Sequence, residues 1–262
     1  MNIAVLTIFP DLFEPFWSYG IVRRAIDKNR IAQQTINIRD FAPGRHRVTD
    51  DRPYGGGCGM VMKPEPLAGA IRAAKEKSPT SKAILLTPQG KVFNQQMARD
   101  LAACDGMVMV CGRYEGIDER ICHRYIDDEV SIGDFVMTGG ELAAMVIIDA
   151  VIRLLPDVLG NEDSADNDSF SNGLLEHAHF TRPPEFEGMD VPDVLMSGNH
   201  GRIDRWRLES ALMRTFLKRP DLLMSKQLSA EEIDILKSWY QQIERIIQAK
   251  SLPGSGALPG KG

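Results

Sequence analysis

The stretch Ser131-Ile132-Gly133-Asp134-Phe135-Val136-Met137-Thr138-Gly139-Gly140-Glu141 decides the fold. A strand is expected just before its glycines, at 129–132, and an apolar helix follows at 142–155, ending at Pro156 because proline cannot continue a helix. Glycine lets backbone approach a ligand closely, and the first amides of a helix point at the same space. The stretch therefore predicts a pocket for a nucleotide-like ligand, although a turn without a ligand explains one such loop equally well.

Two further loops follow the same pattern. The apolar run 83–86 leads into Thr87-Pro88-Gln89-Gly90, and the run 107–110 leads into Cys111-Gly112-Arg113-Tyr114-Glu115-Gly116. Each reads as a buried strand, a turn and then a helical segment. Because ligands of α/β proteins bind outside the carboxyl ends of the strands, three such ends together favour a ligand site.

The first forty residues predict a doubly wound parallel sheet. A strand at 3–8, a helix at 11–29 and a strand at 34–38 form a β-α-β unit. Thr7-Ile8-Phe9-Pro10 follows the first strand, where a dinucleotide fold would carry G-x-G-x-x-G. A conventional Rossmann cofactor site is therefore disfavoured.

Composition bounds the class of protein and its partners. A chain of 262 residues with 43% hydrophobic residues can bury one large or two ordinary cores. The net charge of −5 provides no global basic field, so a nucleic-acid surface has to be local. The four cysteines lack metal-site spacing and indicate reduced thiols in a cytoplasmic protein. No signal peptide is evident, and the apolar run 142–155 is too short to span a bilayer, so no membrane association is expected.

The second half changes character after Pro156. Residues 157–173 are acidic and rich in Asn, Ser and Gly, which indicates a flexible linker. Helices are expected at 202–218 and at 229–249, the latter opened by a capping box that runs from Ser229 to Glu232. The end, 251–262, has the composition of a disordered tail.

Two charged segments are candidates for an interface. The loop 45–60 is basic at its start and glycine-rich at its end, and a site or interface role is favoured over a passive loop. Between residues 200 and 226, seven Lys or Arg stand against three Asp or Glu. At about 100° per residue, Arg207, Arg214 and Lys218 share one helix face. This face either contacts phosphates or is an ordinary solvated surface.

An ordered set of motifs resembles one family. It comprises Asp51-Arg52-Pro53-Tyr54-Gly55-Gly56-Gly57, Leu86-Thr87-Pro88-Gln89-Gly90, the segments 110–120 and 131–141, Asp168-Ser169-Phe170, Thr181-Arg182-Pro183 and Leu195-Met196-Ser197-Gly198-Asn199-His200. Together they closely resemble the bacterial tRNA (guanine-N(1)-)-methyltransferases of the SPOUT class, from residue 1 to about residue 249. Any one motif is weak, but the ordered set is highly specific.

The resemblance implies an α/β fold with a SPOUT-type parallel sheet, a deep trefoil knot and a smaller all-helical C-terminal domain. It implies an S-adenosylmethionine-binding domain at 1–160, a flexible catalytic linker at 161–176, a helical tRNA-binding domain at 177–250 and a disordered tail at 251–262. It also implies a homodimer with a shared active site.

The implied reaction transfers the methyl group of S-adenosylmethionine to N(1) of the guanosine at position 37, just 3′ of the anticodon of tRNA. A magnesium ion is expected to assist turnover, with no residue assigned to hold it. Two alternatives stay open: a SPOUT methyltransferase for another RNA site, and a non-catalytic protein that binds RNA or a nucleotide.

The resemblance also assigns residues. Cofactor contacts are expected from Leu85, Pro88, Gly112, Glu115, Ile132, Gly133, Asp134, Phe135, Val136, Met137, Gly139 and Gly140. The family often has an aromatic residue at position 85 and Tyr at position 135. The reaction needs a base for the guanine proton and a cation for charge on its carbonyl, and Asp168 and Arg153 are the implied pair. Arg153 has independent support, since an arginine within an apolar run needs a partner if it is buried.

Overall fold

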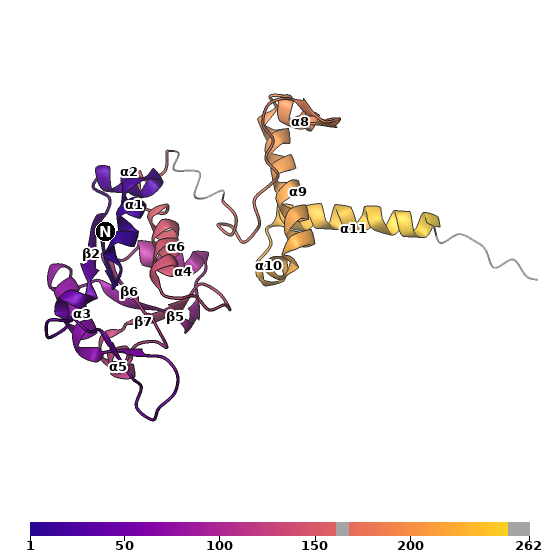
Figure 1. Cartoon of the computed structure of the whole chain (residues 1–262). Helices are drawn as coiled ribbons and strands as arrows, with labels where there is room; N and C mark the ends of the chain where they lie inside the picture. Colours follow the sequence, from indigo (N-terminus) through magenta and orange to yellow (C-terminus); the bar gives the residue numbers. More distant parts are fainter. Residues whose placement is uncertain (161–167, 251–262) are drawn as a thin grey trace, which may run out of the picture. The chain divides into compact units, whose positions relative to one another are not determined.

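The computed structural model describes residues 1–160 and 168–250 (Figure 1). The chain divides into two compact units, Met1–Ala165 and Asp166–Gly262. Each unit is described by itself below. Among the described helices, none has the length and apolar character needed to cross a membrane.

The first unit is built on a five-stranded sheet in the order β2-β1-β6-β5-β7. All four neighbouring pairs are parallel, as predicted. The strands are β1 (Asn2–Thr7), β2 (Ala32–Asn37), β5 (Lys82–Val92), β6 (Gly106–Cys111) and β7 (Asp128–Ser131).

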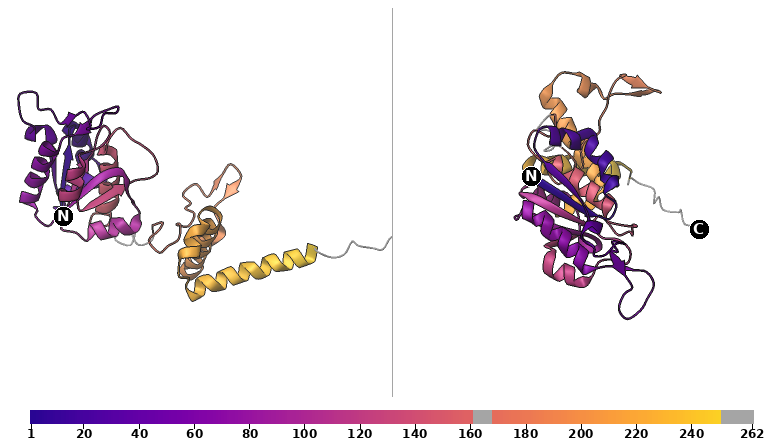
Figure 2. Two further views of the ribbon diagram at one scale, coloured as in Figure 1. Left: turned by 90° about the horizontal axis from the view of Figure 1, so that it is seen from below. Right: turned by 60° about the vertical axis from the view of Figure 1, so that its left-hand side comes forward.

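Helices cover both faces of this sheet (Figures 1 and 2). Alternate residues of β1 enter different cores: Ile3 and Val5 belong to one, Ala4 and Leu6 to the other. The first core is closed by α1 (Phe13–Ser18), α2 (Gly20–Asp27), α4 (Gln95–Ala102) and α6 (Glu141–Ile152). The second is closed by α3 (Pro64–Lys77) and α5 (Glu119–Tyr125). The doubly wound arrangement is thereby confirmed.

The first unit also contains four short elements: the 3-10 helices η1 (Pro10–Leu12) and η2 (Ile38–Phe41), and the antiparallel strands β3 (Asp50–Asp51) and β4 (Val61–Met62). The long loop 45–60 therefore remains mostly irregular, as expected, with β3 inside it and β4 directly after it.

Two local predictions are wrong. The single helix predicted for 11–29 is broken into η1, α1 and α2, because Tyr19 is extended (φ −130°, ψ 162°) and Gly20 takes a φ of 63°. The turn predicted at 87–90 lies inside β5, which continues to Val92 with a register shift between Leu86 and Lys91. Leu86 and Lys91 both pair with Val130, so residues 87–90 form an irregularity within the strand, and a Cβ on Gly90 would overlap the backbone nitrogen of Val130.

The second unit is mainly helical. It contains α8 (Asp193–Met196), α9 (His200–Lys218), α10 (Pro220–Ser225) and α11 (Ala230–Lys250). The expected capping box is present: the Ser229 N–H donates to Glu232 Oε2 (2.7 Å) and the Glu232 N–H donates to Ser229 Oγ (3.2 Å).

The unit is not all-helical, which corrects the prediction. A hairpin joins β8 (Glu185–Phe186) to β9 (Met189–Asp190). Its two turn residues, Glu187 and Gly188, both have positive φ (54° and 78°), the conformation that tight hairpins require.

The segment expected to be a flexible linker is only partly described. Residues 161–167 lie outside the described residues, as does the expected tail, 251–262. Residues 168–176, by contrast, are anchored on the second unit. Leu174 is 1% exposed in a core with Leu212 and Ile235, and the Leu175 N–H donates to Thr215 Oγ1 (2.9 Å). This part does not match the expected flexibility, because Leu174 gives it an apolar anchor.

Candidate functional site

A cavity of about 380 Å³ lies at the carboxyl ends of β6 and β7 and beside residues 85–89, where the register of β5 shifts. Residues from the three predicted loops, between 85 and 89, 112 and 117, and 130 and 140, line it. The lining contains every residue predicted to contact a cofactor except Asp134, namely Leu85, Pro88, Gly112, Glu115, Ile132, Gly133, Phe135, Val136, Met137, Gly139 and Gly140. The structure therefore brings the three loops of the sequence analysis into one site.

Glycines allow two loops to touch at the wall of this cavity. The Gly140 N–H donates to the Gly112 carbonyl (2.9 Å), and Gly139 bridges to Arg113. A Cβ on Gly140 would lie 2.9 Å from Cys111 Cα, while one on Gly139 would overlap the Arg113 side chain. A Cβ on Gly112 would meet no atom closer than 3.7 Å. Close packing therefore favours glycine at 139 and 140, whereas a Cβ on Gly112 would make only ordinary van der Waals contacts.

A buried ion pair holds the same junction. Glu141, at the start of α6, is 1% exposed and accepts hydrogen bonds from Thr7 Oγ1 (2.8 Å) and Arg113 Nε (3.0 Å). The Arg113 guanidinium also lies 4.5 Å above the centre of the Phe9 ring. The contacts join the end of β1, the loop after β6 and the first turn of α6. Sequence reasoning did not assign Thr7, Arg113 or Glu141 a role; the available signal was a carboxylate opening an otherwise apolar helix.

The glycine-rich end of the loop 45–60 packs against residues that line the cavity. The Glu115 N–H donates to the Met60 carbonyl (3.0 Å), and the Met62 N–H donates to the Gly116 carbonyl (3.0 Å). A Cβ on Gly59 would overlap the Glu115 carboxylate, so the glycine makes room for that side chain. The end of the loop thus contacts Glu115, which lines the cavity, and its functional role stays a prediction.

The cysteines near the cavity do not favour covalent chemistry. Burial, with the nearby Glu141 carboxylate, raises the pKa of the Cys111 thiol well above its usual range. Burial and the Glu119 carboxylate raise the pKa of Cys122, which lines the cavity, to about 11. Since only the thiolate is a nucleophile, both thiols are inert near neutral pH.

The two residues predicted to be catalytic do not line the cavity. Arg153 is the C-cap of α6 and is exposed, so burial gives no independent support for its role. Asp168 belongs to the second unit and is partly buried, and its carbonyl accepts a hydrogen bond from the Ser171 N–H (3.1 Å). Their catalytic roles stay predictions.

The predicted basic face lies on α9. Arg207 and Lys218 are exposed, and Arg207 Nη1 lies 3.2 Å from Asp204 Oδ1. Arg214 is half-buried, and its Nε has no hydrogen-bond partner within 1–160 and 168–250. Neighbouring basic residues pair locally, Arg205 with Glu209 and Arg219 with Asp221. Much of the charge excess is therefore balanced within the unit.

Comparison with known proteins decides the family. The model of the family described as "tRNA (Guanine-1)-methyltransferase TrmD" matches residues 1–225. The chain belongs to this family. It is 57% identical over 258 residues to the tRNA (guanine-N(1)-)-methyltransferase of Desulfatibacillum aliphaticivorans, covering 98% of each chain. Enzymes of the same name from Dehalococcoides mccartyi (56% over 248 residues, 94% of this chain and 97% of the relative) and Listeria monocytogenes (51% over 241 residues, 91% and 98%) are also similar.

The family confirms the resemblance drawn from the ordered motifs and implies S-adenosylmethionine as the methyl donor. The cavity fits such a ligand. Its volume of about 380 Å³ falls within the roughly 300–1,000 Å³ of small-molecule sites. Leu85, Leu86 and Ile132 offer apolar surface for an adenine ring, and Gly112 leaves backbone exposed.

Proposed function

We propose that this chain transfers the methyl group of S-adenosylmethionine to N(1) of the guanosine at position 37 of tRNA, just 3′ of the anticodon. The observation that carries the proposal is the cavity between the middle of β5 and the carboxyl ends of β6 and β7, in a chain of the tRNA (guanine-1)-methyltransferase family. The family match supports tRNA as the substrate and methyl transfer as the reaction.

The cavity residues would hold the donor. Leu85, Pro88, Ile132 and Met137 give apolar contact, and the backbone at Gly112 and Gly139 gives polar groups. Glu115, an exposed carboxylate that lines the cavity, would receive the donor's ammonium group. When bound, S-adenosylmethionine supplies a methyl group already activated on a sulfonium.

The reaction also requires a group that accepts the guanine proton and a group that stabilises the charge on the guanine carbonyl. N(1) of guanine carries a proton, so a base must accept it as the new bond forms. We assign this role to the Asp168 carboxylate, and assign Arg153 to stabilising the negative charge that develops on the guanine carbonyl. The support is the match of Asp168-Ser169-Phe170 to the family motif together with the chemical need for a base and a cation.

Each unit has its own part in the proposal. The first binds the donor, the segment 161–176 carries the base, and the second holds tRNA through Arg207, Arg214 and Lys218. The support is the exposure of Arg207 and Lys218 on α9 in a chain with a net charge of −5.

The deep trefoil knot of the SPOUT class is also part of the proposal. The path of the chain supports it: β7 pairs with β5 at the sheet edge, and the segment after β7 then returns to Gly112, which follows β6 on the other side of β5. A knot formed by this return would be one of the rare exceptions to the rule that protein chains are not knotted.

The proposed assembly is a homodimer with a shared active site. Most apolar residues of α6 pack on the sheet, but Leu142 and Val146 are 62% and 50% exposed. An exposed apolar strip of this kind suits a second copy of the chain. We further propose a cytoplasmic location, which its reduced cysteines support, and assistance by Mg²⁺, with no ligand assigned.

The test is a methylation assay with labelled S-adenosylmethionine. Unmodified tRNA transcripts that carry G or A at position 37 are incubated with the protein, and label is expected in the G transcript alone. Label in both transcripts would indicate another RNA site, and label in neither would indicate a binding protein.

A further inference from the structure

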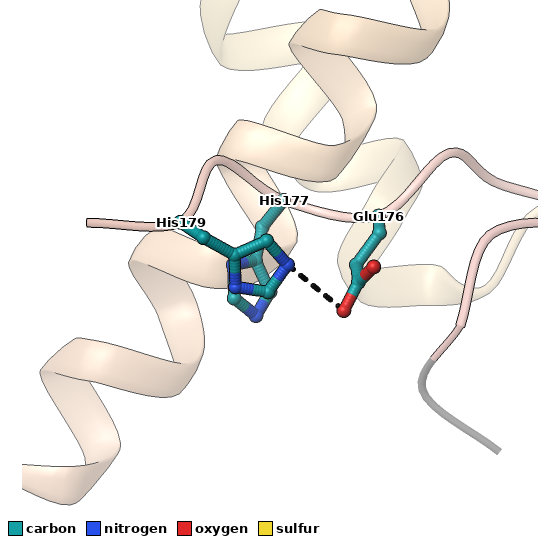
Figure 3. A group of neighbouring side chains, drawn as sticks. All are labelled: Glu176, His177 and His179. Carbon is teal, nitrogen blue, oxygen red and sulfur yellow. Dashed lines mark ion pairs between the residues drawn. The ribbon is translucent and has the colours of Figure 1, made fainter. Parts of the chain in front are cut away.

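Three potential metal ligands gather in the second unit, at and just after the end of the segment 161–176, and the proposed reaction gives none of the three a role. Glu176, His177 and His179 each offer one ligand atom, and these atoms lie within 4.8 Å of one another (Figure 3). His179 Nε2 lies 2.9 Å from Glu176 Oε1, and the two imidazole rings have their centres 4.5 Å apart. From this geometry we propose that the cluster binds a zinc-like divalent transition-metal ion.

Side chains of α9 and a neighbouring serine fix the backbone that carries the three ligands. The Ala178 N–H donates to Ser210 Oγ (3.0 Å), and the Glu176 N–H donates to Ser169 Oγ (3.0 Å). The His177 ring also packs at 6.3 Å from Trp206. Such support reduces the conformational freedom that the ligands lose on binding an ion.

The His177 ring is set in the state that a metal requires. His177 Nδ1 lies 3.1 Å from the Ala178 carbonyl oxygen. A carbonyl oxygen only accepts, so in the tautomer that makes this hydrogen bond Nδ1 carries the hydrogen and Nε2 keeps the lone pair that can bind a metal. A backbone carbonyl that orients a ligand histidine in this way is a common feature of zinc sites.

The ligand types select the class of ion. Two imidazoles and one carboxylate form a set that zinc uses, and imidazole suits Zn²⁺, Co²⁺ and Ni²⁺. Mg²⁺ prefers oxygen ligands in an octahedral shell, so the magnesium proposed for turnover is not assigned here. Three protein ligands leave one position of a tetrahedral site for water or an anion. The His179 side chain is 63% exposed, so an ion in solution can reach the cluster.

The competing explanation is an ordinary ion pair between Glu176 and His179. The chain offers a matched control, because His123 Nε2 lies 3.4 Å from Glu119 Oε1 in an exposed pair with a single imidazole. An ion pair of this kind has too few ligands to hold zinc.

The test is calorimetric titration of the tag-free, full-length protein with ZnCl₂. One Zn²⁺ per chain is expected, with affinity lowered more than about tenfold by His177→Gln, His179→Gln or Glu176→Gln and unchanged by His123→Gln. Circular dichroism checks that each variant is folded, and exposed His179 is the safest position to change. Titration with Co²⁺ gives a second readout, since its visible spectrum reports coordination by imidazole.

Three results would overturn the proposal. The first is no measurable Zn²⁺ binding to the unaltered chain. The second is binding that survives both His179→Gln and Glu176→Gln, as a site built on the exposed Cys58 thiol would. The third is an equal loss of affinity in His123→Gln. Because the readout is metal affinity, failure of the methylation assay leaves this test unaffected.

Discussion

At the residue scale, the cavity depends on one carboxylate that cannot reach water. Glu141 and Arg113 have side chains only 2% and 19% exposed, and they face each other at 3.0 Å. Removing one partner of a buried pair leaves an uncompensated charge. Arg113→Met is therefore expected to lower the free energy of unfolding by about 3–5 kcal/mol. Adding Glu141→Gln should recover part of the loss, because a neutral amide can still accept from Thr7.

Urea unfolding followed by circular dichroism measures both effects. Arg120→Met is the matched control, since Arg120 pairs with Asp118 while 73% exposed, and its loss should cost much less stability than the loss of Arg113. Equal costs for Arg113→Met and Arg120→Met would contradict the view that burial makes the first pair important.

A second residue carries the proposed chemistry. Asp168→Asn keeps the shape of the side chain but cannot accept the guanine proton. The single-turnover rate is expected to fall by about 10²–10⁴-fold, while affinity for S-adenosylmethionine measured by calorimetry stays within about twofold. Asp166→Asn, two residues away, serves as the control and should leave both values unchanged. Near-normal turnover in Asp168→Asn would remove this residue from the mechanism.

At the element scale, the close approach of β5 and β7 depends on Gly90. A Cβ there would overlap the Val130 backbone nitrogen, which belongs to the neighbouring strand. Gly90→Ala is expected to cost about 1–3 kcal/mol or more, because backbone has to move. Gly112→Ala should cost less than about 1 kcal/mol, since the nearest atom to the added carbon would lie 3.7 Å away, an ordinary van der Waals contact. Thermal unfolding of the two variants tests this, and the reverse order would be incompatible with the strand pairing described.

The same region marks what the sequence could and could not predict. β6 and α6 were predictable because continuous apolar runs have few alternatives to a buried strand or helix. The continuation of β5 through Pro88 and Gly90 was not, since both residues usually mark turns and their reason here is a tertiary contact with β7. The break at Tyr19–Gly20 was likewise hidden in a helical pattern of apolar residues.

The candidate site was likewise predictable from the sequence only in part. Loops at strand ends were predictable, since the topology of parallel sheets brings such ends together. The buried pair of Glu141 and Arg113 was not, because a carboxylate in the first turn of a helix is ordinarily a solvated partner of the helix dipole. The burial of Glu141 becomes visible only once Thr7 and Arg113 are placed around it.

The other element with a testable role is α9. Reversing charge with Arg207→Glu and Lys218→Glu should weaken tRNA binding and lower the slope of log affinity against log salt by roughly one for each lost phosphate contact. Lys237→Glu on α11 makes the same change of charge elsewhere and should leave the slope unaltered. A salt titration by filter binding gives the slopes. If all three variants behave alike, the effect is one of net charge and not of this face.

At the scale of the whole molecule, the proposed shared site makes a quantitative prediction. Two inactive proteins are mixed: Asp168→Ala, with an intact cavity, and Gly112→Leu, with a filled cavity but intact Asp168. Gly112 suits this purpose because a Cβ added there would lie 3.7 Å from the nearest atom. A Cβ added to Gly140 would lie 2.9 Å from Cys111 Cα and would disturb the fold. Both proteins are expected to be folded by circular dichroism.

Subunit exchange then separates two arrangements of the site. In a mixed dimer, the intact cavity meets the intact Asp168 of the partner, while the other site lacks both. Random exchange of equal amounts makes half of the dimers mixed, each with one working site of two, so roughly a quarter of unaltered activity should return. If Asp168 serves the cavity of its own chain, every site in the mixture lacks one part and activity stays absent. Exchange is verified by mass spectrometry of the intact dimers, so verified exchange without recovered activity would assign Asp168 to its own chain.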